Sequence, residues 1–360
     1  MSEPIRILFL ADSHVGLDLP VRPRVGRRRR GFDFLANYST ALAPALSGSV
    51  DVVVHGGDVF NRSAPHATVA HQAYEPLRRI ADLGVPVFIV PGNHERSRLP
   101  HARLLTHPNV HVFDVPRTFS VDVRSFRIAF AGFPYEREDV RTKFSALVDQ
   151  TNWRDHEAEH RLLCIHHCVE GATVGPGDFT FTTASDVIRG RDISADFAAV
   201  LSGHIHRHQV LTTDLDRHPL GAPVLYPGSI ERTSFAEVGE PKGFMTLRLG
   251  SESGMSWEFH DLPARPMERH EVDASRIDGG AFERFILDVV RRAPRDAVLS
   301  IRVTGELRDE HWRVMSSAYL RGIVPATMNV DVTPANGFLR RPAVGPKRRD
   351  ESLQHVLFAD

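Results

Sequence analysis

Residues 5–14 read IRILFLADSH, an apolar run that leads directly into polar side chains able to bind a metal ion. The run is too short for a helix and rich in Ile and Leu, which is typical of a buried β-strand. Asp12 and His14 stand where that strand should end. The same pattern, a short strand followed by polar side chains, recurs along the chain and determines the predicted fold.

Four later apolar runs end in the same way. They occupy residues 51–54, 85–90, 161–165 and 198–201. The groups that follow them are, in order, Gly56, Gly57 and Asp58; Gly92, Asn93, His94 and Glu95; His166 and His167; and Gly203, His204 and His206. Short strands of this kind, separated by segments with helical spacing, predict an α/β domain.

Two of the intervening segments, residues 32–46 and 66–83, carry apolar side chains at the spacing of an amphipathic helix. Pro76 lies inside the second segment. Because proline has no N–H to donate and its ring crowds the preceding turn, we expect Pro76 to kink or split that helix.

The polar groups at the strand ends should meet in space. In an α/β sheet the carboxyl ends of neighbouring strands converge on one edge, so residues far apart in the sequence become neighbours. Glycines at positions 56, 57, 92 and 203 suit tight turns or a close backbone approach beside a metal. Carboxylates, an amide and imidazoles without a thiolate favour Mn²⁺, iron or Zn²⁺. A pair of such cations would attract a phosphate, so phosphoester hydrolysis is the expected chemistry.

The sequence changes character after residue 261. Residues 262–266 contain two prolines and are expected to form a linker. Strands are predicted next at residues 267–272, 297–303 and 327–332, and helices at 280–293 and 310–322. From residue 336 onward basic side chains stand among Pro and Gly, which predicts a basic tail. The predicted division is a catalytic domain at 1–262, a small α+β accessory domain at 263–335 and the tail at 336–360.

The composition sets limits on the partners. The chain has 360 residues, with 44 Lys and Arg against 45 Asp and Glu, and a net charge of −1. Binding to a polyanion must therefore come from local clusters. No apolar stretch approaches the roughly 20 residues of a membrane span, so we expect a cytoplasmic protein without a membrane partner. Two cysteines are too few for a disulfide framework or a zinc knuckle.

The polar motifs occur in a characteristic order: D-x-H, G-D, G-N-H-E, an isolated H and G-H-x-H. This order resembles that of the calcineurin-like metallophosphoesterases. Within that superfamily the chain is similar to the Mre11/SbcD DNA-repair nucleases. The matching segments are DSHVG (12–16), GDVF (57–60), PGNH (91–94) and YPGSIER (226–232), followed by KGF (242–244). The resemblance covers about residues 5–250. It implies a β-sandwich flanked by helices, a small capping domain, and a nuclease that cleaves DNA phosphodiester bonds as an exonuclease, an endonuclease or both.

The resemblance also implies a site for two divalent metal ions, for which we expect Mn²⁺. Asp58 would bridge the two ions. The other six implied ligands are Asp12, His14 and His206 for one ion, and Asn93, His166 and His204 for the other.

His94 is the implied catalytic residue. It would face the scissile phosphate and protonate or stabilise the leaving oxygen, a role that suits imidazole because its pKa lies near 6.5. His166 is preferred over His167 as a ligand, because the family's ligand directly follows the apolar run.

Two positions depart from the family pattern. Some members carry a histidine three residues after the bridging aspartate that favours exonucleolytic geometry, and this chain has Asn61 there, so the balance of the two nuclease activities is left open. Glu95 replaces a more usual aspartate. G-N-H-E also occurs in protein Ser/Thr phosphatases, but the arginine that precedes it there is replaced by Pro91.

The resemblance implies three partners: DNA, an SbcC/Rad50-like ATPase and a second copy of the chain. The helix at 66–83 is the candidate dimerisation element. The tail after Asn336 is short for the helical segment by which family nucleases grip the ATPase, so dependence on ATP is left open.

Six arginines stand within nine residues, at positions 22, 24 and 27–30, just after the first metal motif. A solvated surface loop is one interpretation. Contact with DNA phosphates is the one we prefer, because the loop could flank the active-site groove. The predicted contacts are Arg27, Arg28, Arg29 and Arg30.

Two alternative functions use the same fold. One is a phosphodiesterase for small molecules or cyclic nucleotides, which would have little use for an arginine loop and a second domain. The other is a non-catalytic scaffold subunit, which is disfavoured because every implied ligand position is filled.

Overall fold

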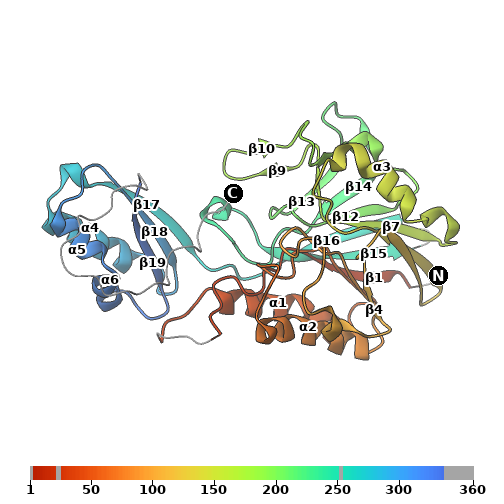
Figure 1. Cartoon of the computed structure of the whole chain (residues 1–360), viewed down its shortest axis with the longest axis horizontal. Helices are drawn as coiled ribbons and strands as arrows, with labels where there is room; N and C mark the ends of the chain where they lie inside the picture. The colour runs from red at the N-terminus through yellow and green to blue at the C-terminus, as the bar shows by residue number, and fades with distance from the viewer. Residues whose placement is uncertain (1–2, 22–25, 251–253, 336–360) are drawn as a thin grey trace. The chain divides into compact units, whose positions relative to one another are not determined.

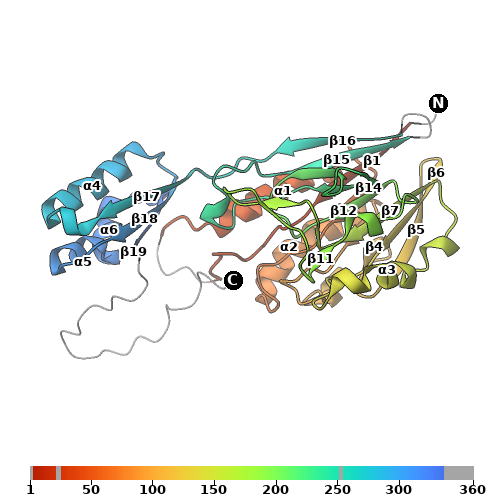
Figure 2. The same cartoon turned by 90° about the horizontal axis from the view of Figure 1, so that it is seen from above.

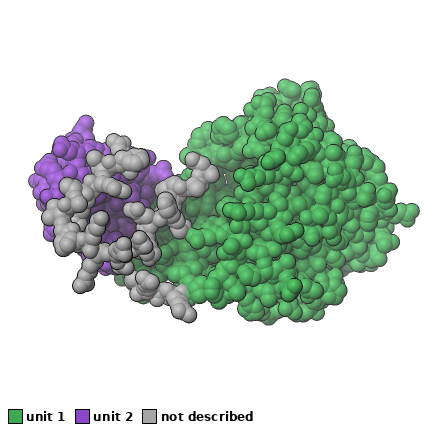
Figure 3. All heavy atoms as spheres, in the orientation of Figure 1, with its two compact units in different colours: residues 1–268, 294–298, 325–329 green, residues 269–293, 299–324, 330–360 purple. Residues whose placement is uncertain are grey.

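The computed structural model describes residues 3–21, 26–250 and 254–335. The chain divides into two compact units, which Figure 3 colours separately. Unit 1 comprises residues 1–268, 294–298 and 325–329, and unit 2 comprises residues 269–293, 299–324 and 330–360. The predicted basic tail and the arginines at positions 22 and 24 lie outside the described residues.

Unit 1 contains two six-stranded sheets (Figure 1). The strand order of the first sheet is β16 (Gly254–Asp261), β15 (Gly243–Gly250), β1 (Ile5–Leu10), β2 (Val52–His55), β3 (Val87–Ile89) and β4 (Val110–Val112). Strands β1 to β4 run parallel to one another. At one edge of the sheet, β15 runs antiparallel to β1, and β16 runs antiparallel to β15.

The second sheet has the strand order β13 (Gln209–Thr213), β14 (Pro219–Tyr226), β12 (Ala199–Ser202), β7 (His160–Ile165), β6 (Phe126–Gly132) and β5 (Arg117–Val123). Its four inner strands run parallel and both edge strands are antiparallel to their neighbours. Two short pairs complete the unit: β8 (Cys168–Val169) with β11 (Val187–Ile188), and β9 (Thr173–Val174) with β10 (Phe179–Thr180).

Alternation along β1 explains why the sheets stack. Successive side chains of a strand point to opposite faces. Ile7 and Phe9 pack into a core shared with Phe130 of the second sheet, whereas Leu8 and Leu10 pack into the core beneath the helices. Helices α1 (Gly31–Leu46) and α2 (Ala67–Asp82) cover the first sheet, and α3 (Val140–Gln150) covers the second (Figures 1 and 2). The implied β-sandwich flanked by helices is confirmed.

Helix α2 corrects one prediction. It runs without a break from Ala67 to Asp82 with Pro76 inside it, so Pro76 does not split the helix. Proline leaves the carbonyl four residues earlier without its helical partner. Here that residue is Gln72, which is exposed, so water can satisfy its carbonyl oxygen.

Unit 2 and the strand segments that lead into it form a three-stranded sheet of β17 (Met267–Asp273), β18 (Val298–Thr304) and β19 (Asn329–Pro334), with α4 (Gly279–Arg292). The single helix predicted at 310–322 is wrong, because the structure has α5 (Asp309–Met315) and α6 (Ser317–Ile323). Ser316 separates them: its backbone is extended and its side chain accepts a hydrogen bond from Tyr319 N. Serine side chains compete for backbone N–H groups in this way and favour helix starts.

The segment at 262–266 is tied to unit 1. Leu262 is buried in the core beneath the helices. Arg265 is also buried, and its Nη1 donates to Asp33 Oδ2 over 3.0 Å.

Single 3₁₀ turns join several elements: η1 (Ala102–Leu105), η2 (Trp153–Asp155), η3 (Gly190–Asp192), η4 (Phe235–Glu237) and η5 (Ala274–Arg276). Within the described part of the chain, no helix is long and apolar enough to cross a membrane.

Candidate active site

The residues predicted as ligands come from both sheets of unit 1. Residues 12, 14, 58 and 93 follow β1, β2 and β3 of the first sheet, and residues 166, 204 and 206 follow β7 and β12 of the second. The expectation of a single sheet edge is therefore incomplete. The site forms where the carboxyl ends of parallel strands from two stacked sheets meet.

Backbone hydrogen bonds hold the loops of this site together. Asp12 N donates to Gly57 O (2.9 Å) and His14 N donates to Asp58 O (3.0 Å), so the loops after β1 and β2 run side by side. His204 N donates to the Asp12 carboxylate over 3.1 Å, which links the second sheet to the first.

Four of the proposed ligands have left-handed backbone conformations. The φ angles are 51° at Asp12, 42° at His14, 52° at Asp58 and 80° at His204. Such conformations cost of order 1–3 kcal/mol each in a residue with a side chain and concentrate at functional sites. Of the four glycines expected to serve tight turns or a close backbone approach, only Gly57 has a positive φ.

Glycines in these loops also permit a close approach between the backbone and neighbouring groups. A Cβ atom on Gly92 would lie 2.2 Å from Asp58 Oδ1, and one on Gly203 would lie 2.4 Å from Gly56 O. A Cβ atom on Gly57 would lie 2.3 Å from His166 Nδ1. At Gly57 and Gly92 the backbone therefore lies against His166 and Asp58, two of the proposed ligands, with no space for a side chain.

Asp12, His14 and His206 form one group of possible ligands, with donor atoms within 4.8 Å of one another. His14 Nε2 and His206 Nε2 are 3.0 Å apart. Asp12 Oδ1 lies 3.8 Å from His206 Nε2.

Asp58 belongs to two further groups, one with Asp12 and His166 and one with His14 and His94. Its Oδ2 lies 3.4 Å from His166 Nε2 and 4.0 Å from His14 Nε2. Asp12 and His14 also belong to two groups each, so these side chains form one continuous cluster, in which Asp58 Oδ2 lies between His14 and His166.

Asn93 joins the remaining two histidines. Its Oδ1 lies 2.9 Å from His166 Nε2 and 3.1 Å from His204 Nδ1. The structure thus brings all seven predicted ligands into one cluster. Four of them are buried (Asp12, His14, Asp58 and His166), and the other three are partly buried.

Burial and neighbouring charges shift the pKa values of several groups in this cluster. Burial lowers the pKa of His14 well below its ordinary value and that of His204 to about 3, so both rings are neutral. Burial also raises the pKa of Asp12 to about 6. Burial disfavours the charged form of His166, but the Asp58 carboxylate beside it outweighs this and raises its pKa to about 9.

The hydrogen bonds of His166 show that the cluster fits a divalent cation. His166 Nδ1 donates to Gly56 O over 2.7 Å. A neutral His166 therefore directs its Nε2 lone pair at Asn93 Oδ1 and Asp58 Oδ2, which only accept hydrogen bonds. Either a proton or a cation must lie between these acceptors. Nitrogen and oxygen donors in this number suit Mn²⁺, iron or Zn²⁺.

Over residues 5–208, more than half of the chain, the sequence matches the family model described as calcineurin-like phosphoesterase. The chain belongs to this family. It is therefore a metal-dependent hydrolase of phosphate esters, and the cluster provides candidate ligands for its divalent metal.

Three relatives are similar to this phosphoesterase. The DNA double-strand break repair protein Mre11 of Halobacterium salinarum is 27% identical over 311 residues, which cover 84% of this chain and 71% of the relative. Mre11 of Haloferax volcanii is 27% identical over 308 residues, covering 84% and 62%. The uncharacterized metallophosphoesterase YhaO of Bacillus subtilis is 27% identical over 246 residues, covering 67% and 55%.

His94 lies at the edge of the cluster formed by the seven proposed ligands. Its side chain is 38% exposed, and its Nε2 is 3.8 Å from Asp58 Oδ2. Its Nδ1 donates to the carbonyl oxygen of Asn61 over 2.9 Å. The residue that departs from the family pattern thus orients His94 through its backbone.

Glu95 is a structural residue whose role the sequence did not reveal, beyond its departure from the family pattern. Its buried carboxylate accepts hydrogen bonds from Phe60 N (2.7 Å), Gly92 N (2.8 Å) and Asp58 N (3.1 Å). It joins the loops after β2 and β3. Burial, followed by the nearby Asp58, raises the pKa of Glu95 to about 8.

His167 forms its contacts away from the seven proposed metal ligands. Its Nε2 accepts a hydrogen bond from Glu136 N over 3.0 Å, and its ring stacks on Tyr135 at 4.9 Å. Burial lowers its pKa well below the ordinary value, so it is neutral.

The four described arginines of the loop make bonds within the chain. Arg27 donates to Met328 O over 3.1 Å, Arg28 pairs with Asp33, Arg29 pairs with Asp18, and Arg30 donates to Arg232 O. The side chains of Arg28 and Arg29 remain 40% and 45% exposed.

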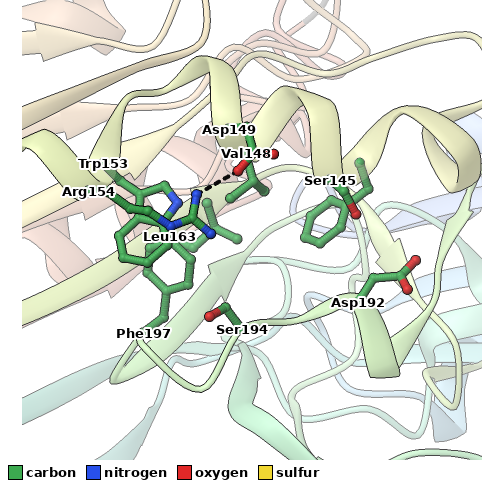
Figure 4. Close-up of a pocket in the computed structure, with 10 residues that line it drawn as sticks. Ser145, Val148, Asp149, Trp153, Arg154, Leu163, Asp192, Ser194 and Phe197 are labelled. Carbon is green, nitrogen blue, oxygen red and sulfur yellow. Dashed lines mark hydrogen bonds and ion pairs between the residues drawn. The ribbon is translucent and has the colours of Figure 1, made fainter.

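A hollow of about 160 Å³ lies beside α3 (Figure 4). Phe144, Trp153 and Phe197 line it, and the Arg154 guanidinium lies 4.3 Å over the Trp153 ring. Arg154 also pairs with Asp149, as the dashed line in Figure 4 marks. None of the proposed ligands lines this hollow.

Proposed function

We propose that this phosphoesterase is a Mn²⁺-dependent nuclease that hydrolyses DNA phosphodiester bonds in DNA repair, as an exonuclease, an endonuclease or both. The observation that carries the proposal is the position of the Asp58 carboxylate, whose Oδ2 lies 3.4 Å from His166 Nε2 and 4.0 Å from His14 Nε2, between ligands assigned to different ions, with His94 beside it. A two-metal site needs one such bridging group.

In this proposal Asp12, His14 and His206 hold one Mn²⁺ ion with Asp58, and Asn93, His166 and His204 hold the other. When bound, a pair of divalent ions would supply an activated water molecule and offset the charge of the phosphate. The chain orients these ligands by hydrogen bonds from the rings to backbone carbonyls, as at His166 and Gly56.

His94 acts as the general acid. Its Nδ1 is fixed by Asn61 O, which leaves Nε2 to carry the proton given to the leaving oxygen. Its partial exposure suits contact with a phosphate that enters from solvent.

DNA is favoured as the substrate for two reasons. The similar proteins from Halobacterium salinarum and Haloferax volcanii are named DNA double-strand break repair proteins, and the similarity covers 84% of this chain. Arg28 and Arg29 carry exposed guanidinium groups, and each has further N–H donors for phosphates. Arg27 and Arg30 are less exposed and support the loop.

An SbcC/Rad50-like ATPase, a second copy of the chain and a cytoplasmic location complete the proposal. The dimer interface is proposed at α2. A hollow of about 400 Å³ beside it is lined by Leu35 and Tyr38 of α1 and by His71 and Pro76 of α2, and a partner helix could fill it.

The purified protein should be incubated with MnCl₂ and, separately, end-labelled duplex DNA, circular single-stranded DNA and a cyclic nucleotide. We expect cleavage of at least one DNA substrate and no cleavage after removal of Mn²⁺ by a chelator. The variant Asn93→Ala should lose the activity, because it removes the amide oxygen between His166 and His204.

Cleavage of the cyclic nucleotide alone would instead establish a small-molecule phosphodiesterase. Inactivity on all three substrates, with and without an SbcC/Rad50-like ATPase, would indicate a scaffold subunit.

A further inference from the structure

A buried ion pair lies directly behind one proposed metal ligand. Lys242 Nζ is 2.5 Å from Glu237 Oε2, and both residues are buried. Glu237 Oε1 lies 3.1 Å from His206 Nδ1. Because a carboxylate only accepts hydrogen bonds, His206 donates through Nδ1, and its Nε2 lone pair faces His14 and Asp12.

A local turn sets the position of Glu237. The residue ends η4, whose first turn is capped by Ser234 through a 3.2 Å hydrogen bond from Ala236 N. Thr233 N and Ser229 Oγ each donate to Glu237 Oε2 over 3.3 Å. These bonds hold the carboxylate in one orientation behind His206.

Lys242 is enclosed by oxygen atoms. Besides Glu237, its Nζ contacts Ser229 Oγ (2.9 Å), the backbone oxygen of His206 (2.9 Å) and Glu240 Oε2 (3.5 Å). The same ammonium therefore contacts both the backbone of His206 and the carboxylate behind its ring. Apolar side chains of similar volume often replace a buried ion pair without loss of stability, so stability alone does not account for the pair.

We propose that Glu237 is a positioning residue for His206, and that Lys242 fixes Glu237 in that role. A carboxylate behind a metal-binding histidine fixes the ring tautomer and orientation and strengthens the ring as a ligand. The inference rests on the proposed function, because it takes His206 as a metal ligand. It adds two residues that contact neither metal nor substrate.

The test compares four proteins by calorimetric titration with MnCl₂ and by thermal unfolding without metal. They are the parent, Glu237→Gln, the double variant Glu237→Leu with Lys242→Met, and the control Glu170→Gln. The double variant removes both charges together and leaves neither unpaired. The control makes the same carboxylate-to-amide change at a residue that pairs with Arg141 and accepts from Gly190 N.

We expect the double variant to bind one of two Mn²⁺ ions roughly 10–100-fold more weakly than the parent, while a cooperative metal-free unfolding transition shows that it is folded. Glu237→Gln retains a neutral acceptor and should lose less affinity, and the control should lose none. The Mn²⁺ concentration for half-maximal nuclease activity should rise in the same order.

Parent-like affinity for both ions in a folded double variant would overturn the role of Glu237 and leave the proposed function intact. If the parent binds no Mn²⁺, the proposed function and this inference both fail.

Discussion

Asp58 illustrates how closely individual residues are placed at the site. Its Oδ1 accepts a hydrogen bond from His94 N over 2.9 Å, while its Oδ2 faces His166. Gly92 lies against the same carboxylate with no space for a side chain. The position of the Asp58 carboxylate, the proposed bridging group, therefore depends on the residue type at position 92, which makes no chemical contribution.

Replacing Gly92 by alanine should disable the enzyme. The added Cβ atom would lie 2.2 Å from Asp58 Oδ1 and must displace it. A misplacement of about 1 Å at a reacting centre costs on the order of 100-fold in rate, so we expect kcat/KM to fall at least that far. Kinetics on DNA with saturating Mn²⁺ measure the effect.

Gly177→Ala is the matched control, because no atom lies within 4 Å of the Cβ position there. Equal activity of Gly92→Ala and Gly177→Ala would show that the Asp58 carboxylate does not need its observed position.

His94→Gln should lower kcat on DNA by roughly 10²–10⁴-fold, the usual contribution of a general acid. The affinity for Mn²⁺ should change little, because His94 is not among the seven proposed ligands. A phosphodiester with a p-nitrophenol leaving group needs no proton and should be affected much less. An equal loss on both substrates would argue against His94 as the acid.

At the scale of elements, the arginine loop gives a prediction about DNA binding. The double variant Arg28→Ala with Arg29→Ala should bind DNA more weakly. The slope of log K against log salt should become shallower by about 0.9 for each phosphate that the loop no longer neutralises. Fluorescence anisotropy over a range of salt concentrations measures both quantities.

Arg154→Ala serves as the control for this variant. Arg154 of η2 is exposed and pairs with Asp149 of α3, outside the arginine loop. An unchanged affinity and slope in the loop variant would show that these guanidinium groups serve only their pairs with Asp33 and Asp18.

Sequence patterns predict the elements of this protein better than they predict their ends. The apolar run at 5–11 gives β1 because its side chains have two cores to fill. The possible split at Pro76 and the single helix at 310–322 are both absent from the structure, for a shared reason. Whether a proline is tolerated or a serine starts a new helix depends on which backbone groups reach solvent or side chains, and that depends on the tertiary fold.

The place of the proposed ligands in the fold could be predicted because each lies within four residues of a strand end, and the family resemblance identifies them. Glu237 and Lys242 follow no such pattern. Their relation to His206 depends on the η4 turn and on β14 and β15, which lie in different sheets. Glu95 shows the same limit, since its bonds to Asp58 N and Phe60 N cross more than thirty residues of sequence.

For the whole molecule, the charged cluster predicts how stability depends on pH. The pKa of Glu95 is raised to about 8 and that of His166 to about 9, above their ordinary values of 4.5 and 6.5. Both groups hold protons in the folded state that the unfolded chain releases at lower pH. Their contribution to stability is complete below the unfolded pKa and is lost as the pH rises through the folded pKa.

The metal-free protein should therefore lose stability from pH 7 to pH 9, with a fall in Tm of roughly 3 °C or more. The stabilisation by Mn²⁺ should grow over the same range, because the metal replaces a proton at His166. Calorimetry with a chelator and with MnCl₂ measures both. His166→Asn should flatten the metal-free profile, and a metal-free Tm that rises across this range would contradict the assignment.

In the proposed site, seven side chains from two sheets close around two cations with Asp58 between them. Anomalous diffraction from crystals soaked in MnCl₂, recorded near the manganese edge, tests it directly. We predict two peaks about 3.5–4 Å apart, one beside Asp12 and His206, one beside Asn93 and His204, and both in contact with Asp58. The absence of peaks from the cluster, or peaks that Asp58 does not contact, would contradict a two-metal site bridged by Asp58.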